Sequence, residues 1–116
     1  MTTEIKFRDW NPETKEMRYF DLDGYDREVH NAYGNIMQFT GLLDKNGKEI
    51  FVGDVIKIKC NGDIIIGDVF YNQGRCCYMI NHPAGYNGSF GLHALTIEIC
   101  DEFNIIGNIY QNPELV

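Results

Sequence analysis

The amino-acid sequence predicts a mainly β protein, and three of its features lead to this fold class. Hydrophobic residues do not recur with the long 3.6-residue period of an amphipathic helix. Glycine, asparagine and proline turn signals instead separate short apolar runs at intervals of about 8–14 residues, as in barrels and sandwiches. A chain of 116 residues has the size of one domain, and a short antiparallel sheet of this kind curls into a small barrel. We therefore expect a single domain over residues 1–116, with little helix.

Residues 1–34 are expected to form an additional N-terminal hairpin and a loop. Residues 4–9 alternate between the two faces of a strand, so that Arg8 lies on the face opposite Phe7. An Asn-Pro turn follows, and residues 17–20 return as the second strand. The polar remainder of this segment, rich in aspartate, glycine and asparagine, predicts an irregular loop.

Residues 35–116 are expected to form the barrel itself. The Asn46-Gly47 pair is a strong hairpin signal, because both residues tolerate a positive φ. Gly53 and Asp54 predict a tight turn into a half-buried strand whose apolar residues alternate with lysines. Strands are expected at residues 35–42, 49–51, 55–60, 64–71, 76–80 and 103–110. The meandering strands after the Gly-Asp turn suit an SH3-like barrel core.

Details of the barrel follow from single residues. Gly67 interrupts its strand and predicts a bend or bulge. Residues 90–95 predict one short helical turn with Leu92 and Leu95 on the core, and residues 96–100 begin the last strand pairing. The predicted core face of the strand after the Gly-Asp turn carries Ile56, Ile58 and Cys60.

The chain is acidic, with a formal net charge of −7, and its basic residues lie mostly in the first half. A general nucleic-acid surface is disfavoured, because attraction to phosphate needs a positive surface. One group of lysines surrounds a predicted hairpin, at Lys45, Lys48, Lys57 and Lys59. These lysines form either a nucleic-acid contact or a solvated, charged turn and edge that discourages pairing between molecules.

Aromatic residues make up 13% of the chain, enough to raise the question of a binding surface. Most are expected to pack within strands, where aromatic side chains fit well. The alternative is that a few stay exposed and form a partner surface, for which we single out Trp10, Tyr86 and Phe90.

The spacing of the reactive residues predicts no catalytic or metal-binding site. Residues 21–32 lack the glycine and glutamate that a calcium loop requires at its sixth and twelfth positions. A zinc site from Cys76, His82 and His93 lacks the usual close pairs of ligands. A catalytic centre would need His82 and His93 to converge with Cys77, and the spacing leaves this open. We expect no cofactor, no metal and no enzyme activity.

The chain carries no apolar run near the ~20 residues of a membrane-spanning helix and no secretory signal at its start. We therefore expect a cytoplasmic protein that does not contact a membrane and whose cysteines stay reduced. At least two of the four cysteines are expected in the core, among Cys60, Cys76, Cys77 and Cys100.

Three ordered blocks of the sequence resemble the YopX family. The opening block is IKFRDWN at residues 5–11, with TKEM at residues 14–17. The central block is MQFTGLLDKNGKEIF at residues 37–51, with GDVI at residues 53–56. The closing block is IIGNIYQNPEL at residues 105–115, so the resemblance spans nearly the whole chain.

The resemblance implies a protein encoded by phages and prophages of Gram-positive bacteria and related hosts, with an SH3-like barrel and extra strands. It implies no reaction, since the family has no established activity. In physical terms the blocks look structural: Asp54 can bond local amides, and Asn108 and Asn112 can tie the C-terminal strand. Backbone freedom is expected at Gly41, Gly47, Gly53 and Gly107.

The leading hypothesis is a non-catalytic module that binds a host or phage protein, or a second copy of itself, in the host bacterial cell. Two alternatives use the same barrel: binding of nucleic acid through the lysines, or acidic mimicry of DNA that occupies a basic host protein. A third hypothesis is an enzyme working in the loop at residues 81–93.

Overall fold

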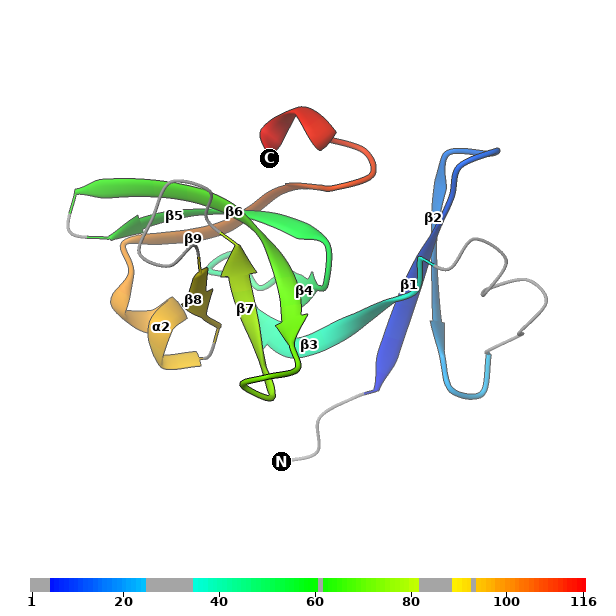
Figure 1. Cartoon of the computed structure of the whole chain (residues 1–116), viewed down its shortest axis with the longest axis horizontal. Coiled ribbons are helices and arrows are strands. Elements are labelled where there is room, and N and C mark those ends of the chain that lie inside the picture. Colours follow the sequence, from blue (N-terminus) through cyan, green and yellow to red (C-terminus); the bar gives the residue numbers. More distant parts are fainter. Residues whose placement is uncertain (1–4, 25–34, 61, 82–88, 93) are drawn as a thin grey trace.

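The computed structural model describes residues 5–24, 35–60, 62–81, 89–92 and 94–116. The described part holds nine strands in two antiparallel sheets, one of four strands and one of five. Figure 1 shows the two sheets along the long axis of the molecule, with strand β3 (Met37–Leu43) reaching from one toward the other. The prediction of a mainly β, antiparallel protein is confirmed.

The four-stranded sheet has the order β2-β1-β3-β4. Its other strands are β1 (Lys6–Asn11), β2 (Glu16–Asp21) and β4 (Glu49–Phe51). Asn11 sets the turn of the N-terminal hairpin, because its Oδ1 accepts hydrogen bonds from the amides of the second and third residues after it. β1 also pairs with β3, so the hairpin continues into strands that we expected in the barrel.

The five-stranded sheet has the order β8-β7-β6-β5-β9. Its strands are β5 (Asp54–Cys60), β6 (Asp63–Asn72), β7 (Cys77–Asn81), β8 (Ser89–Gly91) and β9 (Glu102–Asn108). β5, β6 and β7 meander as predicted, and β9 returns beside β5. Within the described residues, β8 and β9 form no ladder with each other, so the sheet is a curled half-barrel. The SH3-like detail stays a prediction.

The segment after β7 corrects the prediction. The helical turn expected at residues 90–95 lies further along the chain, as the helix α2 (Ala94–Ile99) after the short strand β8, and the strand expected at residues 96–100 is wrong. Ile97 and Cys100 are buried three positions apart, which is the spacing of one helical face. Packing against the core therefore overrides the strand propensity of this β-branched segment.

The main hydrophobic core joins the five-stranded sheet to β4 and α2. Its buried cluster consists of Ile50, Ile56, Ile58, Val69, Ile80, Leu92, Ile97, Cys100 and Phe103. The predicted core face of β5 is confirmed at Ile56 and Ile58, and Cys60 packs partly buried against the cluster. Leu92 is buried as predicted, whereas the side chain of Leu95 lies outside the described residues.

Glycines mark two different constraints on the backbone. Gly41, Gly47 and Gly53 have φ values of +86°, +80° and +90°, which confirms the expected freedom within the irregular part of β3 and at two turns. Gly67 does not form the expected bulge, since its pairing with β5 is regular. A Cβ at Gly67 would instead overlap the carbonyl oxygen of Asn81, so close approach of β7 explains this glycine.

Candidate functional site

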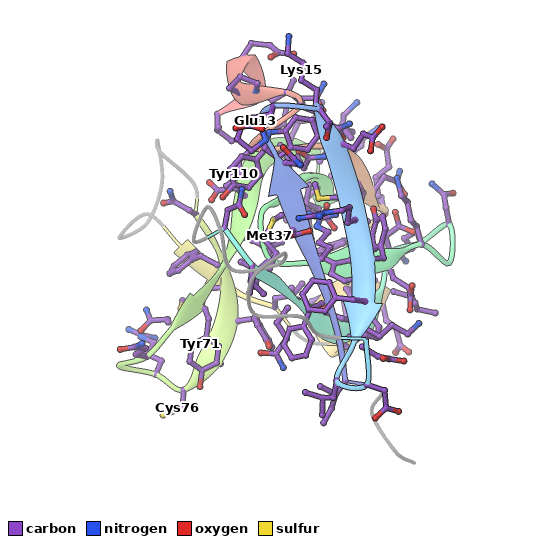
Figure 2. The ribbon with its side chains drawn as sticks, turned by 90° about the vertical axis from the view of Figure 1, so that its right-hand side faces the viewer. Glu13, Lys15, Met37, Tyr71, Cys76 and Tyr110 are labelled. Atoms are coloured by element: carbon purple, nitrogen blue, oxygen red, sulfur yellow. The ribbon has the colours of Figure 1, made fainter. Side chains whose placement is uncertain are left out.

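The N-terminal hairpin lies against the C-terminal end of the chain. Trp10 of β1 stacks on Tyr110, which follows β9, with ring centroids 6.2 Å apart. Figure 2 shows the hairpin turn, marked by Glu13 and Lys15, at the same end of the molecule as Tyr110 and the 3-10 helix η2 (Pro113–Leu115). These segments are far apart in the sequence, and polar residues gather where they meet.

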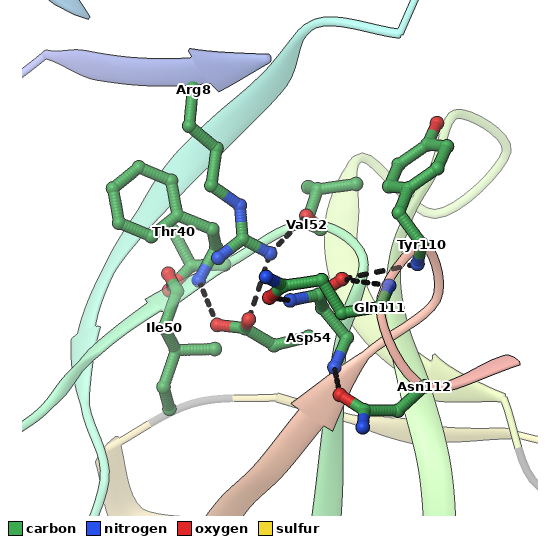
Figure 3. Close-up of polar contacts among 10 residues, drawn as sticks. Arg8, Thr40, Ile50, Val52, Asp54, Tyr110, Gln111 and Asn112 are labelled. Carbon is green, nitrogen blue, oxygen red and sulfur yellow. Dashed lines mark hydrogen bonds and ion pairs between the residues drawn. The ribbon is translucent and has the colours of Figure 1, made fainter. Parts of the chain in front are cut away.

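Arg8 of β1 points into the junction between the two sheets, with only 5% of its side chain exposed. Its Nη2 donates to Asp54 Oδ1 at 2.7 Å and to the carbonyl oxygen of Val52 at 3.3 Å (Figure 3). The guanidinium also lies over the ring of Phe51, 4.8 Å from its centroid. Burial along β1 does not alternate as predicted, since Arg8, Asp9 and Trp10 are buried in succession and the basic face turns inward at Arg8.

Asp54 begins β5 and completes an ion pair that links the two sheets. Its Oδ2 accepts a hydrogen bond from the amide of Phe51 at 2.8 Å, as expected for a carboxylate that bonds local amides. Burial raises the pKa of Asp54, although the neighbouring Arg8 guanidinium acts in the opposite direction. Removing either member leaves a buried charge, so the pair stabilises the junction only as a unit.

Asn108, at the end of β9, organises the loop that faces this pair. Its Oδ1 accepts hydrogen bonds from the amides of Tyr110 at 3.1 Å and Gln111 at 2.9 Å, and its Nδ2 donates to Gln111 Oε1 at 2.6 Å. The Asn108 amide donates to Asn112 Oδ1 at 3.2 Å. A Cβ at Gly107 would overlap the Asn112 side chain, so the glycine leaves room for the loop. The expected tying of the C-terminal strand by these asparagines is confirmed.

A cavity of about 370 Å³ lies between the ion pair and the loop. The side chains that matter for its chemistry are those of Arg8, Tyr19, Lys48, Asp54, Gln111 and Asn112. They come from both sheets and from the segment after β9, so the cavity exists only when the sheets are assembled. It is the candidate functional site.

All three blocks of the sequence resemblance meet at this cavity. Arg8 belongs to the opening block, Lys48 and Asp54 to the central block, and Gln111 and Asn112 to the closing block. Turn chemistry singled out Asp54 and Asn112 from the sequence, but only as structural residues. The inward position of Arg8 was missed, because alternation with apolar residues does not say which face is buried.

The four lysines of the predicted group, Lys45, Lys48, Lys57 and Lys59, lie in three different parts of the structure. Lys48 is the one that lines the cavity. Lys45 Nζ donates to a carbonyl oxygen of α2 at 3.2 Å, and Lys57 Nζ lies 4.0 Å from a glutamate carboxylate of β9. Lys57 and Lys59 lie two positions apart on β5 and therefore share one face of the strand.

The three aromatic residues singled out for a partner surface differ in how the structure places them. Trp10 is 9% exposed and stacks on Tyr110, so little of its ring is accessible. The backbone of Phe90 belongs to β8, but its side chain and the whole of Tyr86 lie outside the described residues.

His82 and His93 also lie outside the described residues, while Cys77 is half-buried on β7. Among the described residues, no group of three or more His, Cys, Asp or Glu side chains is arranged to hold a metal ion. In the same part of the chain, no helix is both long enough and apolar enough to cross a membrane. The expectations about catalysis and metals therefore stay predictions.

Comparison with known proteins confirms the resemblance for the central and closing blocks, while the opening block lies outside the matched residues. The family described as "YopX protein" has a model that matches residues 21–116. Among solved structures, the crystal structure of protein EF1440 from Enterococcus faecalis is similar, with a TM-score of 0.66 at 24% identity, covering 98% of this chain and 99% of that chain. This likeness shows a shared fold, and none of the curated proteins compared matches the chain. Since the family match covers most of its length, the chain belongs to the YopX family.

Proposed function

We propose that this protein is a non-catalytic module that binds a segment of a partner protein in the cavity between its two sheets. The observation that carries the proposal is the cavity itself, which collects charged, amide and aromatic side chains from three distant parts of the sequence. A concave site of this mixed composition can orient a ligand with a few placed polar groups. The partner is a host or phage protein in the bacterial cytoplasm, with a second copy of the chain as the alternative.

The carboxylates of the cavity favour binding over proton transfer. Both oxygens of Asp54 accept hydrogen bonds, and Glu49 forms an ion pair with Lys6. A general base needs an oxygen within hydrogen-bond reach of the proton that it removes. These carboxylates are better placed to hold neighbouring groups, which is why we propose a module without catalytic activity.

The edge of the four-stranded sheet offers a way for an extended segment to reach the cavity. β2 is an edge strand, and none of the described strands pairs with its outer side. Tyr19 of β2 is 64% exposed and meets Phe51 edge-on, with ring centroids 5.5 Å apart. A segment that pairs with β2 would therefore pass an aromatic side chain at the mouth of the cavity.

Selection from a displayed library of random peptides, with the full chain immobilised, tests this proposal. We expect wild type to enrich peptides whose affinity falls about tenfold or more in Tyr19→Ala, because aromatic anchors dominate binding energy. Tyr71→Ala is the matched control, since Tyr71 is 47% exposed on β6 and lies far from the hairpin turn (Figure 2). Failure to enrich any peptide, or equal binding by Tyr19→Ala, overturns the proposal. Sedimentation of the chain alone decides whether its partner is a second copy.

A further inference from the structure

The side-chain oxygens of four residues around the cavity are already occupied, which narrows the groups that remain for a ligand. Asn108 Oδ1 accepts two backbone amides, Asn112 Oδ1 accepts the amide of Asn108, and Gln111 Oε1 accepts Asn108 Nδ2. Both oxygens of Asp54 are occupied as well. These acceptors serve the protein itself, so the groups left over are mainly donors.

The same hydrogen bonds fix the orientation of the two outer amides. A backbone N–H needs an acceptor, so Asn112 must present Oδ1 to the amide of Asn108, which leaves its Nδ2 on the other side. Gln111 must present Oε1 to Asn108 Nδ2, which leaves the Nε2 of Gln111 on the side away from this hydrogen bond. Among the described residues, neither nitrogen has a hydrogen-bond partner, and both side chains line the cavity.

Two cationic side chains add to this set of donors. Arg8 makes its hydrogen bonds through Nη2, while its Nε is buried without a partner among the described residues. Lys48 is exposed, lines the cavity and forms no ion pair within the described part of the chain. Donors from four side chains therefore surround the cavity.

The charges of the cavity limit the ligand to a small negative charge. Lys48 and Arg8 line it together with the carboxylates of Glu49 and Asp54, and Lys6 pairs with Glu49. Two cations and two carboxylates therefore line the cavity, and one of these carboxylates, that of Glu49, is also paired with Lys6. With so little positive charge in the lining, a monoanion suits the cavity better than a phosphate near its full charge of about −2.

We propose that the cavity binds a carboxylate group, held by N–H donors of Arg8, Lys48, Gln111 and Asn112. The proposal rests on the proposed function: the carboxylate belongs to an aspartate, a glutamate or the chain end of the partner segment. A carboxylate has about four acceptor sites, which matches the four donor side chains. A free small carboxylate is the other source of the same chemistry, and the two arms of the experiment separate the sources.

The first arm titrates the ¹⁵N-labelled full chain with sodium acetate at neutral pH and constant ionic strength. Acetamide, which is neutral and nearly the same shape, is the matched probe. We expect acetate to shift the side-chain amide resonances of Gln111 and Asn112, with half-saturation on the order of 10 mM for so small a ligand. Equal shifts with both probes, or none with acetate, overturn the carboxylate site.

Three variants assign the shifts to the cavity. Asn112→Asp keeps an acceptor for the Asn108 amide but replaces the free donor by an anion, so we expect acetate binding to be lost. Lys48→Gln is expected to weaken acetate about tenfold, because a charge-assisted bond becomes a neutral one. Lys57→Gln makes the same change in charge on β5 and should leave the affinity unaltered. Unchanged affinity in folded Asn112→Asp and Lys48→Gln, checked by thermal unfolding, overturns the proposal.

The second arm uses the peptides selected against the wild-type chain. We expect them to share an acidic residue or to require a free carboxyl end, and the amide counterpart to bind about tenfold more weakly. Selected peptides that need Tyr19 but no carboxylate overturn this inference and leave the proposed function intact. Acetate binding without any selected peptide assigns the site to a small carboxylate and overturns the proposed function.

Discussion

The core of the five-stranded sheet and the junction between the sheets are equally buried but held by different forces. Phe103 and Ile80 are fully buried in the core among other apolar side chains. Arg8 and Asp54 are almost as buried at the junction, where they depend on each other and on a few hydrogen bonds. Apolar contacts are many and non-directional, whereas each polar contact has one partner that is costly to lose.

This difference separates stability from recognition within one small domain. The apolar core stabilises the sheet whatever the exact arrangement of its contacts, within limits of volume. The junction brings donors into one cavity only while every bond of its network is made. We therefore expect core substitutions to have graded effects and junction substitutions to act as a unit.

The largest effect is expected from the centre of the core. Phe103→Ala removes a ring with no exposed surface and should lower the free energy of unfolding by about 3–5 kcal/mol. Equilibrium denaturation in urea measures this loss. A loss below about 1 kcal/mol would mean that β9 contributes little to the core, contrary to its burial.

At the junction, one substitution is expected to lower the free energy of unfolding almost as much as Phe103→Ala does. A second substitution is expected to restore most of that free energy. Asp54→Leu leaves the Arg8 guanidinium buried without its partner and should cost about 3–5 kcal/mol. Adding Arg8→Met removes the stranded charge, so the double variant should regain most of this loss. A double-mutant cycle in urea measures the coupling, and simple additivity of the two losses would refute a mutually dependent pair.

A finer comparison sets the exchange of one polar group at the junction against the loss of one methylene group in the core. Asn108→Asp replaces the Nδ2 donor by an oxygen that faces Gln111 Oε1, which should cost about 1–3 kcal/mol without a change in volume. Ile56→Val removes a methylene from the core and should cost about 0.5–1.5 kcal/mol. Thermal or urea unfolding measures both losses of unfolding free energy. A greater loss in Ile56→Val than in Asn108→Asp would contradict the expectation.

The smallest expected effect is a difference in reactivity between an exposed cysteine and a cysteine of the core, measured without any substitution. Burial, together with a hydrogen bond that the Cys100 thiol donates to Cys60, raises the pKa of Cys100 from 9.0 to about 11. At pH 8 this lowers its thiolate fraction about 100-fold, so iodoacetamide should modify the exposed Cys76 first and Cys100 last. Peptide mass spectrometry measures the order. Similar rates for the two cysteines would show that the core opens as readily as the surface.

Local patterns in the sequence account for the turn between β3 and β4 and for much of the five-stranded sheet. The turns at Gly47 and Gly53 and the buried face of Ile56 and Ile58 follow from residues that are neighbours along the chain. The helix α2 was predicted only at its first two residues, since the β-branched residues that follow favour a strand until the core selects which of them is buried.

The sequence by itself determined the mainly β fold, the positions of the hairpin turns and the apolar faces, because these depend on period, glycine freedom and side-chain type over a few residues. Only the tertiary structure decided that Arg8 meets Asp54, a residue 46 positions away, and that the loop after β9 completes a cavity of unused donors beside them. The reason is physical: a contact between distant segments depends on how the two sheets pack, and alternation along one strand does not encode which of its faces meets the other sheet.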